Sequence, residues 1–216
     1  MEEVQEVRRG LPVLGREAPN FEAETTMGKI RLSNYRGKWV VLFSHPADFT
    51  PVCTSEFIGF AEKYQEFKKR NVELIGLSID SVSSHIAWTR NIKEKFGVDI
   101  PFPVIADLSM QIAKLYGMIQ EGESSTVTVR TVFLIDPEGI LKAMIYYPLT
   151  NGRSMNEILR LVDSLQTTYE HKVATPANWK PGDAVVVPPP ATAKAAEERL
   201  KEGYECVDWY FCKKKL

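Results

Sequence analysis

The stretch KWVVLFSHPADFTPVCTSEF, residues 38–57, places a cysteine at the junction of two kinds of secondary structure. Residues 38–45 form an apolar run with branched side chains, which is typical of a buried strand. Thr50 and Pro51 then predict a helix start, because threonine caps helices and proline suits the first helical position, where no backbone donor is needed. Cys53 therefore falls in the first turn of the predicted helix.

A cysteine at a helix start is a candidate nucleophile. The first backbone amides of a helix lack an acceptor within the helix, and the aligned peptide dipoles place partial positive charge at that end. Both effects favour the thiolate, which is the nucleophilic form, and the same amides can hold a developing oxyanion. The alternative is a buried cysteine that packs as a small hydrophobic side chain. The adjoining strand end, the turn bounded by prolines and the Thr50 hydroxyl favour a formed pocket around Cys53.

The residues after the cysteine predict a βαβ unit. Apolar residues spaced by three and four across residues 57–67 indicate one helical face, and residues 71–80 are typical of a second buried strand. A strand, a helix and a strand in this order imply a parallel pair with a right-handed crossover. A further helix is expected at roughly residues 82–96, with an apolar side that contains Ile86, Ile92 and Phe96.

The next segments extend this arrangement. We expect a short strand at residues 102–107, followed by a short helix at residues 109–118 that Ser109 caps. The turn DPEG, residues 136–139, lies between two branched runs and predicts a β-hairpin. Residues 154–168 are amphipathic and helical in pattern. The fold class predicted to about residue 168 is α/β, a central mixed sheet with helices on both faces.

The composition changes after residue 168. Residues 171–193 are rich in proline and lack helical periodicity, so we expect an extended chain laid over a surface. The triple proline, residues 188–190, leaves open a polyproline ligand or a simple connector. A short charged helix is expected at about residues 192–201. The chain thus divides into a domain of residues 1–168 and a C-terminal extension of residues 169–216.

Charge and cysteine content narrow the classes of function. The formal net charge of −1, from 27 basic and 28 acidic residues, gives no electrostatic reason to expect nucleic acid or an anionic membrane as a partner. Residues 1–10 are charged and do not read as a secretory signal, and no apolar run reaches the roughly 18 residues of a membrane span. We therefore expect a cytoplasmic protein, where structural disulfides are rare. Three cysteines cannot all pair within one chain. This favours a chemical role for the cysteines over structural disulfides.

Pro46, Thr50 and Cys53 stand as P-x-x-x-T-x-x-C within HPADFTPVCTSE. This spacing resembles the peroxidatic signature of the peroxiredoxins, thiol peroxidases built on a thioredoxin-like fold. The resemblance runs from about residue 11 to residue 212 and includes PNFEAETTMGKIRLSNYRGKW, VRTVFLIDPEGILKAMIYYP and GRSMNEILRLVDSLQ. The segment SHPADFTPVCT and the long C-terminal extension resemble the sixth, nominally one-cysteine, class of that family.

The resemblance implies a role for each matching residue. Cys53 would be the peroxidatic cysteine, Thr50 would hydrogen-bond the peroxide through its hydroxyl, and Pro46 would shield the pocket from water. Arg130, in VRTVFLID, would polarise the peroxide and favour the thiolate. Judged without the resemblance, Arg130 interrupts a branched strand and could equally be an edge residue that faces water.

Several charged side chains are candidates for support. His45 stands at the strand end before the motif, where it either orients or polarises the cysteine or is satisfied by the backbone. Glu56 is expected to pair with an arginine such as Arg153 around the pocket, and a solvated helix face is the competing interpretation. His85 and His171 are expected at the surface.

The two remaining cysteines, Cys206 and Cys212, flank the segment VDWYF. A zinc site would need four ligands and closer pairing, so no metal is expected there. A sulfenic acid condenses readily with another thiol, which makes a cysteine on a flexible tail a plausible resolver. The pair departs from the one-cysteine class and resembles the ends of some archaeal and thermophile chains. On that resemblance Cys206 resolves Cys53 of the partner chain, and Cys212 exchanges with Cys206 to present a disulfide to a reductant; a free surface thiol is the alternative for Cys212.

The resemblance implies a peroxidase that reduces hydrogen peroxide and alkyl hydroperoxides. A thioredoxin-type protein would restore the thiols, and no metal, haem or flavin would be required. The family also implies a homodimer built through the tail and a ring of five dimers. A redox-sensing holdase chaperone or signalling module with little turnover is the alternative. A thiol–disulfide oxidoreductase is disfavoured, because residues 53–56 contain no second cysteine.

Overall fold

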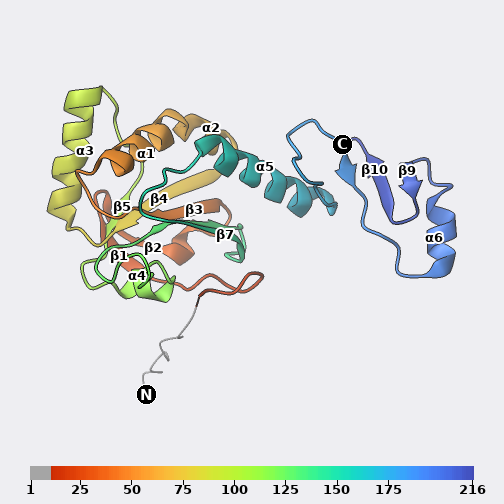
Figure 1. The fold of residues 1–216 in the computed structure, drawn as a ribbon, viewed down its shortest axis with the longest axis horizontal. Coiled ribbons are helices and arrows are strands. Elements are labelled where there is room, and N and C mark those ends of the chain that lie inside the picture. Colours follow the sequence, from red (N-terminus) through yellow and green to blue (C-terminus); the bar gives the residue numbers. More distant parts are fainter. Residues whose placement is uncertain (1–10) are drawn as a thin grey trace, which may run out of the picture. The chain divides into compact units, whose positions relative to one another are not determined.

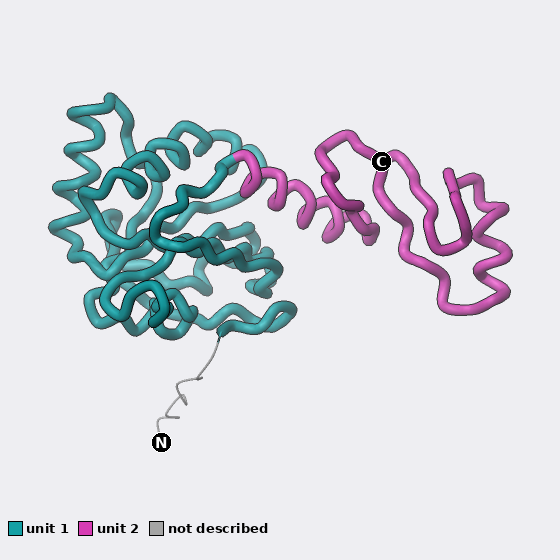
Figure 2. Tube along the Cα trace, in the orientation of Figure 1, with its two compact units in different colours: residues 1–155 teal, residues 156–216 magenta. Residues whose placement is uncertain are grey.

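The computed structural model describes residues 11–216, and the chain divides into two compact units at residue 155 (Figures 1 and 2). The expectation that residues 1–10 are no secretory signal lies outside the described residues. The domain boundary expected at residue 168 stays a prediction. Within residues 11–216 no helix combines the length and the apolar character needed to cross a membrane.

A seven-stranded mixed sheet forms the centre of the first unit, in the order β2-β1-β5-β4-β3-β6-β7 (Figure 1). Its strands are β1 (Glu22–Thr25), β2 (Gly28–Arg31), β3 (Trp39–Ser44), β4 (Val72–Ser78), β5 (Val104–Ala106), β6 (Arg130–Ile135) and β7 (Leu141–Tyr147). β3, β4 and β5 run parallel, whereas β6 pairs antiparallel with both β3 and β7. The predicted mixed sheet, its parallel pair and the β6–β7 hairpin are confirmed. The first hairpin, β1–β2, was not predicted.

Helices cover both faces of this sheet, with α1 and α2 on one side and α4 on the other (Figure 1). The helices of the unit are η1 (Leu32–Tyr35, a 3-10 helix), α1 (Pro51–Glu62), α2 (Tyr64–Lys69), α3 (Val82–Phe96) and α4 (Gln111–Leu115). The helical face predicted across residues 57–67 is shared by α1 and α2, because the backbone at Lys63 leaves the helical region with ψ near 1°. The helix predicted at residues 82–96 is confirmed as α3.

Strand β3 shows why its sequence is apolar without a break. Val40 and Leu42 belong to the core cluster that includes residues of α4. Phe43 instead packs against α1, where the centroid of its ring lies 4.0 Å from that of Phe60 and 5.7 Å from that of Phe57. A strand buried on both faces needs apolar side chains at every position. This burial fixes the end of β3, and with it the loop that leads to Cys53.

Two details of the predicted helices are wrong. In α3, Ile86 and Phe96 are 42% and 57% exposed, and the buried side consists of His85, Trp88 and Ile92. These three residues are spaced by three and four and form one side of the helix. A search for apolar residues alone misses this side, because His85 is polar.

Ser109 is not the cap of α4. That helix begins after Met110, which has a φ of 57°, and the carboxylate of Asp107 accepts the Ala113 amide at 2.7 Å. Asp107 thereby takes over the role of satisfying a free donor in the first turn.

The second unit contains one long helix and a small sheet. Its elements are α5 (Met155–His171), β8 (Val185–Val186), α6 (Ala193–Arg199), β9 (Glu205–Asp208) and β10 (Phe211–Lys214). The strand order is β8-β10-β9, and a small core is formed by Val173, Trp179 and Val185. The helices predicted near residues 154–168 and 192–201 are confirmed as α5 and α6. The cysteine-bearing end of the chain forms the antiparallel hairpin β9–β10, which was not predicted.

The end of α3 generates a stability prediction. Gly97 caps this helix with a φ of 72°, and a Cβ atom there would meet nothing within 4 Å. The substitution Gly97→Ala should therefore cost about 1–2 kcal/mol of unfolding free energy through backbone strain alone. Urea denaturation measures this cost, with Gly122→Ala as the matched control, because Gly122 also has open space and no positive φ. Equal stabilities of the two variants would contradict the assignment of strain.

Candidate active site

Cys53 lies in the first turn of α1, as predicted, and its side chain is fully buried. Thr50 occupies the N-cap position with extended backbone, and its carbonyl accepts the Thr54 amide at 3.0 Å. The Thr50 side chain does not cap the helix; its hydroxyl donates to the carbonyl of Ala47 at 2.9 Å. The hydroxyl proton is thus committed, and the oxygen can still accept a hydrogen bond. Pro46 is buried in the same loop.

Arg130 begins β6 and points its guanidinium at the sulfur. Its Nη1 donates to Sγ of Cys53 at 3.3 Å and to Oε2 of Glu56 at 2.8 Å. Its Nε and Nη2 both donate to the carbonyl of Leu149, at 3.0 and 2.8 Å. Arg130 is only 3% exposed, and β6 is an interior strand between β3 and β7. The alternative of an edge residue that faces water is therefore wrong.

Glu56 joins two arginines in the buried interior. Oε1 accepts the backbone amide and Nε of Arg153, both at 2.8 Å, and Oε2 accepts Nη2 at 2.6 Å. Arg153 is anchored further by Nη1, which donates to the carbonyl of Thr131 at 2.7 Å. The predicted Glu56–Arg153 pair is confirmed, and the solvated helix face is wrong. Burial by itself raises the pKa of Glu56, but Arg153 and then Arg130 outweigh it and hold the pKa below its ordinary value.

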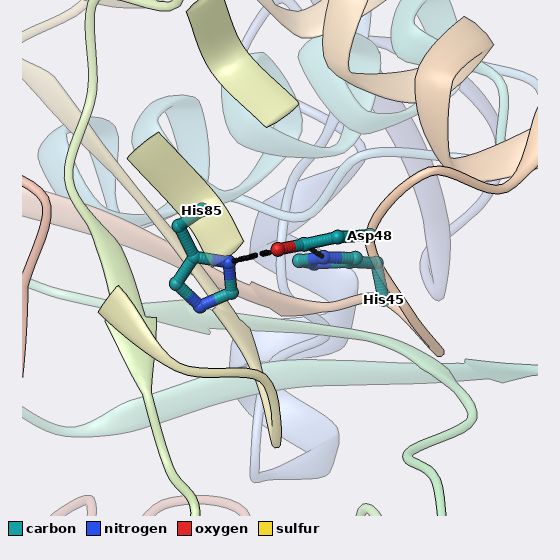
Figure 3. Close-up of side chains that lie close together, drawn as sticks. All are labelled: His45, Asp48 and His85. Atoms are coloured by element: carbon teal, nitrogen blue, oxygen red, sulfur yellow. Dashed lines mark hydrogen bonds and ion pairs between the residues drawn. The ribbon is translucent and has the colours of Figure 1, made fainter. Parts of the chain in front are cut away.

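A second buried polar cluster consists of His45, Asp48 and His85 (Figure 3). His45 is fully buried, and its Nε2 is 2.9 Å from Oδ1 of Asp48. The sequence predicted that the His45 side chain contacts either the cysteine or the backbone. Its Nε2 contacts neither of them. His85 is fully buried rather than at the surface, and its Nδ1 is 2.8 Å from Oδ2 of Asp48. His171, in contrast, is exposed as predicted.

Sequence reasoning missed Asp48 altogether and misplaced His85. The available signals were the three-residue spacing of His45 and Asp48 and the position of His85 on the same helical side as Trp88 and Ile92. Burial lowers the pKa of His45, and the hydrogen bond to Asp48 compensates only in part. Burial would raise the pKa of Asp48, but the hydrogen bonds from both histidines outweigh it and hold the pKa well below its ordinary value.

The two late cysteines lie in the second unit, in the hairpin β9–β10, and are joined by a disulfide. Cys212 is fully buried, whereas Cys206 is partly exposed. In this disulfide-bonded form Cys212 is therefore not a free surface thiol, which was the alternative. Cys53 is the free cysteine of the chain.

The buried carboxylate of Glu56 generates a prediction with a defined pH dependence. Glu56→Gln leaves two buried guanidinium groups without their counter-ion and should cost roughly 3 kcal/mol of unfolding free energy near neutral pH. A carboxyl group with a depressed pKa stabilises the fold above its ordinary pKa and loses that contribution as the pH falls through its folded pKa. The difference between wild type and variant should thus shrink below the ordinary value of 4.5.

Chemical denaturation at several pH values measures this difference. Glu66→Gln is the control, because Glu66 pairs with Lys69 and Arg70 at the exposed surface and should contribute far less. A cost that stays constant down to acidic pH would contradict the role given to the Glu56 charge.

Comparison with known proteins agrees with this geometry. Residues 14–144 match the AhpC/TSA family, and residues 164–203 match the C-terminal domain of 1-Cys peroxiredoxin. A peroxiredoxin of Aquifex aeolicus is 60% identical over 95% of this chain and 98% of its own length. A peroxiredoxin of Methanosarcina mazei is 53% identical with the same two coverages.

Two solved structures have the same fold. A cysteine-to-serine mutant of peroxiredoxin 6 of Arenicola marina is 42% identical, with a TM-score of 0.84 over 94% of this chain and 98% of that one. The yeast mitochondrial 1-Cys peroxiredoxin is also 42% identical, with a TM-score of 0.85 over 95% and 100%. These similarities confirm the predicted thioredoxin-like fold. The chain belongs to the peroxiredoxin family and is a peroxidase of the oxidoreductase class.

Proposed function

We propose that this peroxiredoxin reduces hydrogen peroxide and alkyl hydroperoxides at Cys53. The observation that carries the proposal is the balance of charge around the sulfur. Two buried guanidinium groups, those of Arg130 and Arg153, share one carboxylate, that of Glu56. One positive charge is left over, and Nη1 of Arg130 places it 3.3 Å from the sulfur. A thiolate at Cys53 neutralises that charge, since a buried charge is costly until it is paired.

The reaction follows from these contacts. The Cys53 thiolate attacks one peroxide oxygen, the O–O bond breaks, and the second oxygen takes a proton and leaves as water or an alcohol. The sulfur is oxidised to a sulfenic acid as the peroxide is reduced. Arg130 donates to the oxygens on which charge develops. Thr50, whose proton is committed to Ala47, accepts a hydrogen bond from the peroxide, and Pro46 keeps water out.

The late cysteines complete the cycle. The Cys206 thiol of one chain condenses with the Cys53 sulfenic acid of the partner chain, which forms a disulfide and releases water. Since Cys53 is fully buried, the first turn of α1 has to open for this step. The Cys212 thiolate then attacks Cys206, releases Cys53 as a thiolate and forms the disulfide Cys206–Cys212. A thioredoxin-type dithiol returns that disulfide to two thiols and is itself oxidised.

Assembly and location follow from the family resemblance. We infer a homodimer built through the tail, assembled as a ring of five dimers, in the cytoplasm. The domain boundary at residue 168 belongs to the same proposal, with the extension carrying the resolving cysteines.

A redox-sensing holdase with little turnover is the second candidate. It is favoured by the exposed apolar side chains between the late cysteines, because Val207, Trp209 and Tyr210 are 82%, 41% and 55% exposed. Turnover of peroxide separates the two functions.

Peroxide consumption with excess thiol reductant tests the enzymatic proposal. Wild type should clear hydrogen peroxide, and Cys53→Ser should not. Arg130→Gln should lower the rate by about a hundredfold, because it removes a donor to the developing charge. Arg90→Gln is the matched control at an exposed position and should leave the rate unchanged. If wild type clears hydrogen peroxide no faster than Cys53→Ser, the enzymatic proposal is refuted and the holdase remains as the candidate function.

Non-reducing gels after one equivalent of peroxide test the resolving step. Wild type and Cys212→Ser should form a covalent dimer, which persists in Cys212→Ser because the exchange step is blocked. Cys206→Ser should form none. A covalent dimer in Cys206→Ser would assign the resolving role to a different thiol.

A further inference from the structure

We propose that His85 is a buried imidazolium cation, and that its ion pair with Asp48 positions the loop that carries Pro46 and Thr50. The proposal also assigns the proton of His45 to Nε2. Both histidine states are independent of the proposed function; only the kinetic consequence rests on it. His85 and Asp48 would be positioning residues, since neither touches the sulfur or the peroxide.

The partners of His85 determine its protons. Its Nε2 is 3.1 Å from the backbone carbonyl of Ile105, and a carbonyl oxygen only accepts. Its Nδ1 is 3.0 and 2.8 Å from the two oxygens of Asp48. The pKa of Asp48 is held below its ordinary value of 3.8, so near neutral pH we take it as a carboxylate whose oxygens also only accept. Both ring nitrogens must therefore donate, which makes His85 a cation, fully buried and paired with a carboxylate.

The same accounting fixes His45. Asp48 accepts from Nε2 of His45 at 2.9 Å and from the Ser84 hydroxyl at 2.8 Å. Nε2 of His45 thus carries a proton. The ring is packed against Phe57 and Trp88, with centroids 4.7 and 5.1 Å away. Its Nδ1 is buried without a hydrogen-bond partner among residues 11–216, as expected for the lone pair of a neutral ring.

The ion pair ties the catalytic loop to the scaffold. Asp48 contacts α3 through His85 and Ser84, and its backbone amide donates to Oδ2 of Asp80, which follows β4, at 3.0 Å. The next residue, Phe49, has a φ of 56° and is 57% exposed. A phenylalanine in this conformation persists only where its surroundings impose it. Loss of the ion pair would let Phe49 relax and would displace Thr50, its neighbour at the start of α1.

A metal site is the competing interpretation of this cluster. The ligand-type atoms of His45, Asp48 and His85 lie within 4.8 Å of one another, close enough to share an ion. A metal ion needs the lone pair of a deprotonated nitrogen. A protonated Nδ1 on His85 leaves no such lone pair, so the two interpretations predict different proton patterns.

Nitrogen NMR of the histidine-labelled reduced protein tests the charge state directly. The chain has three histidines, and the variants His85→Gln and His171→Gln assign all three rings. We expect two N–H protons on His85 and a single one, at Nε2, on His45, and no change when zinc is added. A singly protonated His85, or a zinc-induced change at His45 and His85, would overturn the proposal.

The positioning role is tested with Asp48→Asn and His85→Gln. In folded Asp48→Asn the ring of His85 should lose one proton, and the rate of the first reaction with hydrogen peroxide should fall by about ten- to a hundredfold in both variants. His171→Gln, at an exposed position, should retain the wild-type rate. A wild-type rate in folded Asp48→Asn would overturn the positioning role. Failure of wild type itself to react would refute the proposed function and leave the NMR result standing.

Discussion

The buried carboxylate of Glu56 is the contact on which the site depends. It accepts hydrogen bonds from two guanidinium groups that reach it from distant parts of the chain, Arg130 on β6 and Arg153 before α5. Because α1 carries both Glu56 and Cys53, the carboxylate sets the helix against β6 and sets Arg130 against the sulfur. Without this carboxylate, both guanidinium groups would be buried without a counter-ion, which is costly. The same contact therefore orders the fold around the cysteine and determines the charge that the sulfur meets.

The sequence predicted this site well where the residues act through local rules. The apolar run of β3, the proline at the start of α1 and the spacing of Thr50 and Cys53 placed the nucleophile in the first turn of a helix. Glu56 and Arg153 were paired correctly, although 97 residues separate them. Arg130 remained ambiguous from its strand alone, because only the pairing of β6 with β3 and β7 shows that it is interior.

What the sequence could not predict depends on tertiary contacts between polar residues. His85 was expected at the surface, and only the packing of α3 brings it to Asp48. The break between α1 and α2 at Lys63 and the hairpin around Cys206 and Cys212 were missed for a related reason. The apolar periodicity of residues 57–67 runs through the break without interruption, and the hairpin depends on a covalent bond between two strands.

The cysteines of this chain stand in two different settings. Cys53 is a free, buried cysteine in the first unit, beside the guanidinium group of Arg130. The late cysteines form a disulfide in a small hairpin of the second unit, with one sulfur-bearing residue partly exposed. In the cycle proposed above, the first unit carries the sulfur that meets peroxide, and the second carries the disulfide that a reductant would reduce.

We propose that the site activates Cys53 toward peroxide in particular, because Arg130 donates to charge that develops on peroxide oxygens and that a carbon electrophile does not present there. The most direct test compares the second-order rate constants of reduced Cys53 with hydrogen peroxide and with iodoacetamide, both by stopped flow, in a variant whose late cysteines are serines. A free cysteine thiolate serves as the reference for each reagent. The account predicts a peroxide rate that exceeds the reference by orders of magnitude, with an alkylation rate close to it or lower. Equal enhancement of both reactions, or none for peroxide, would contradict it.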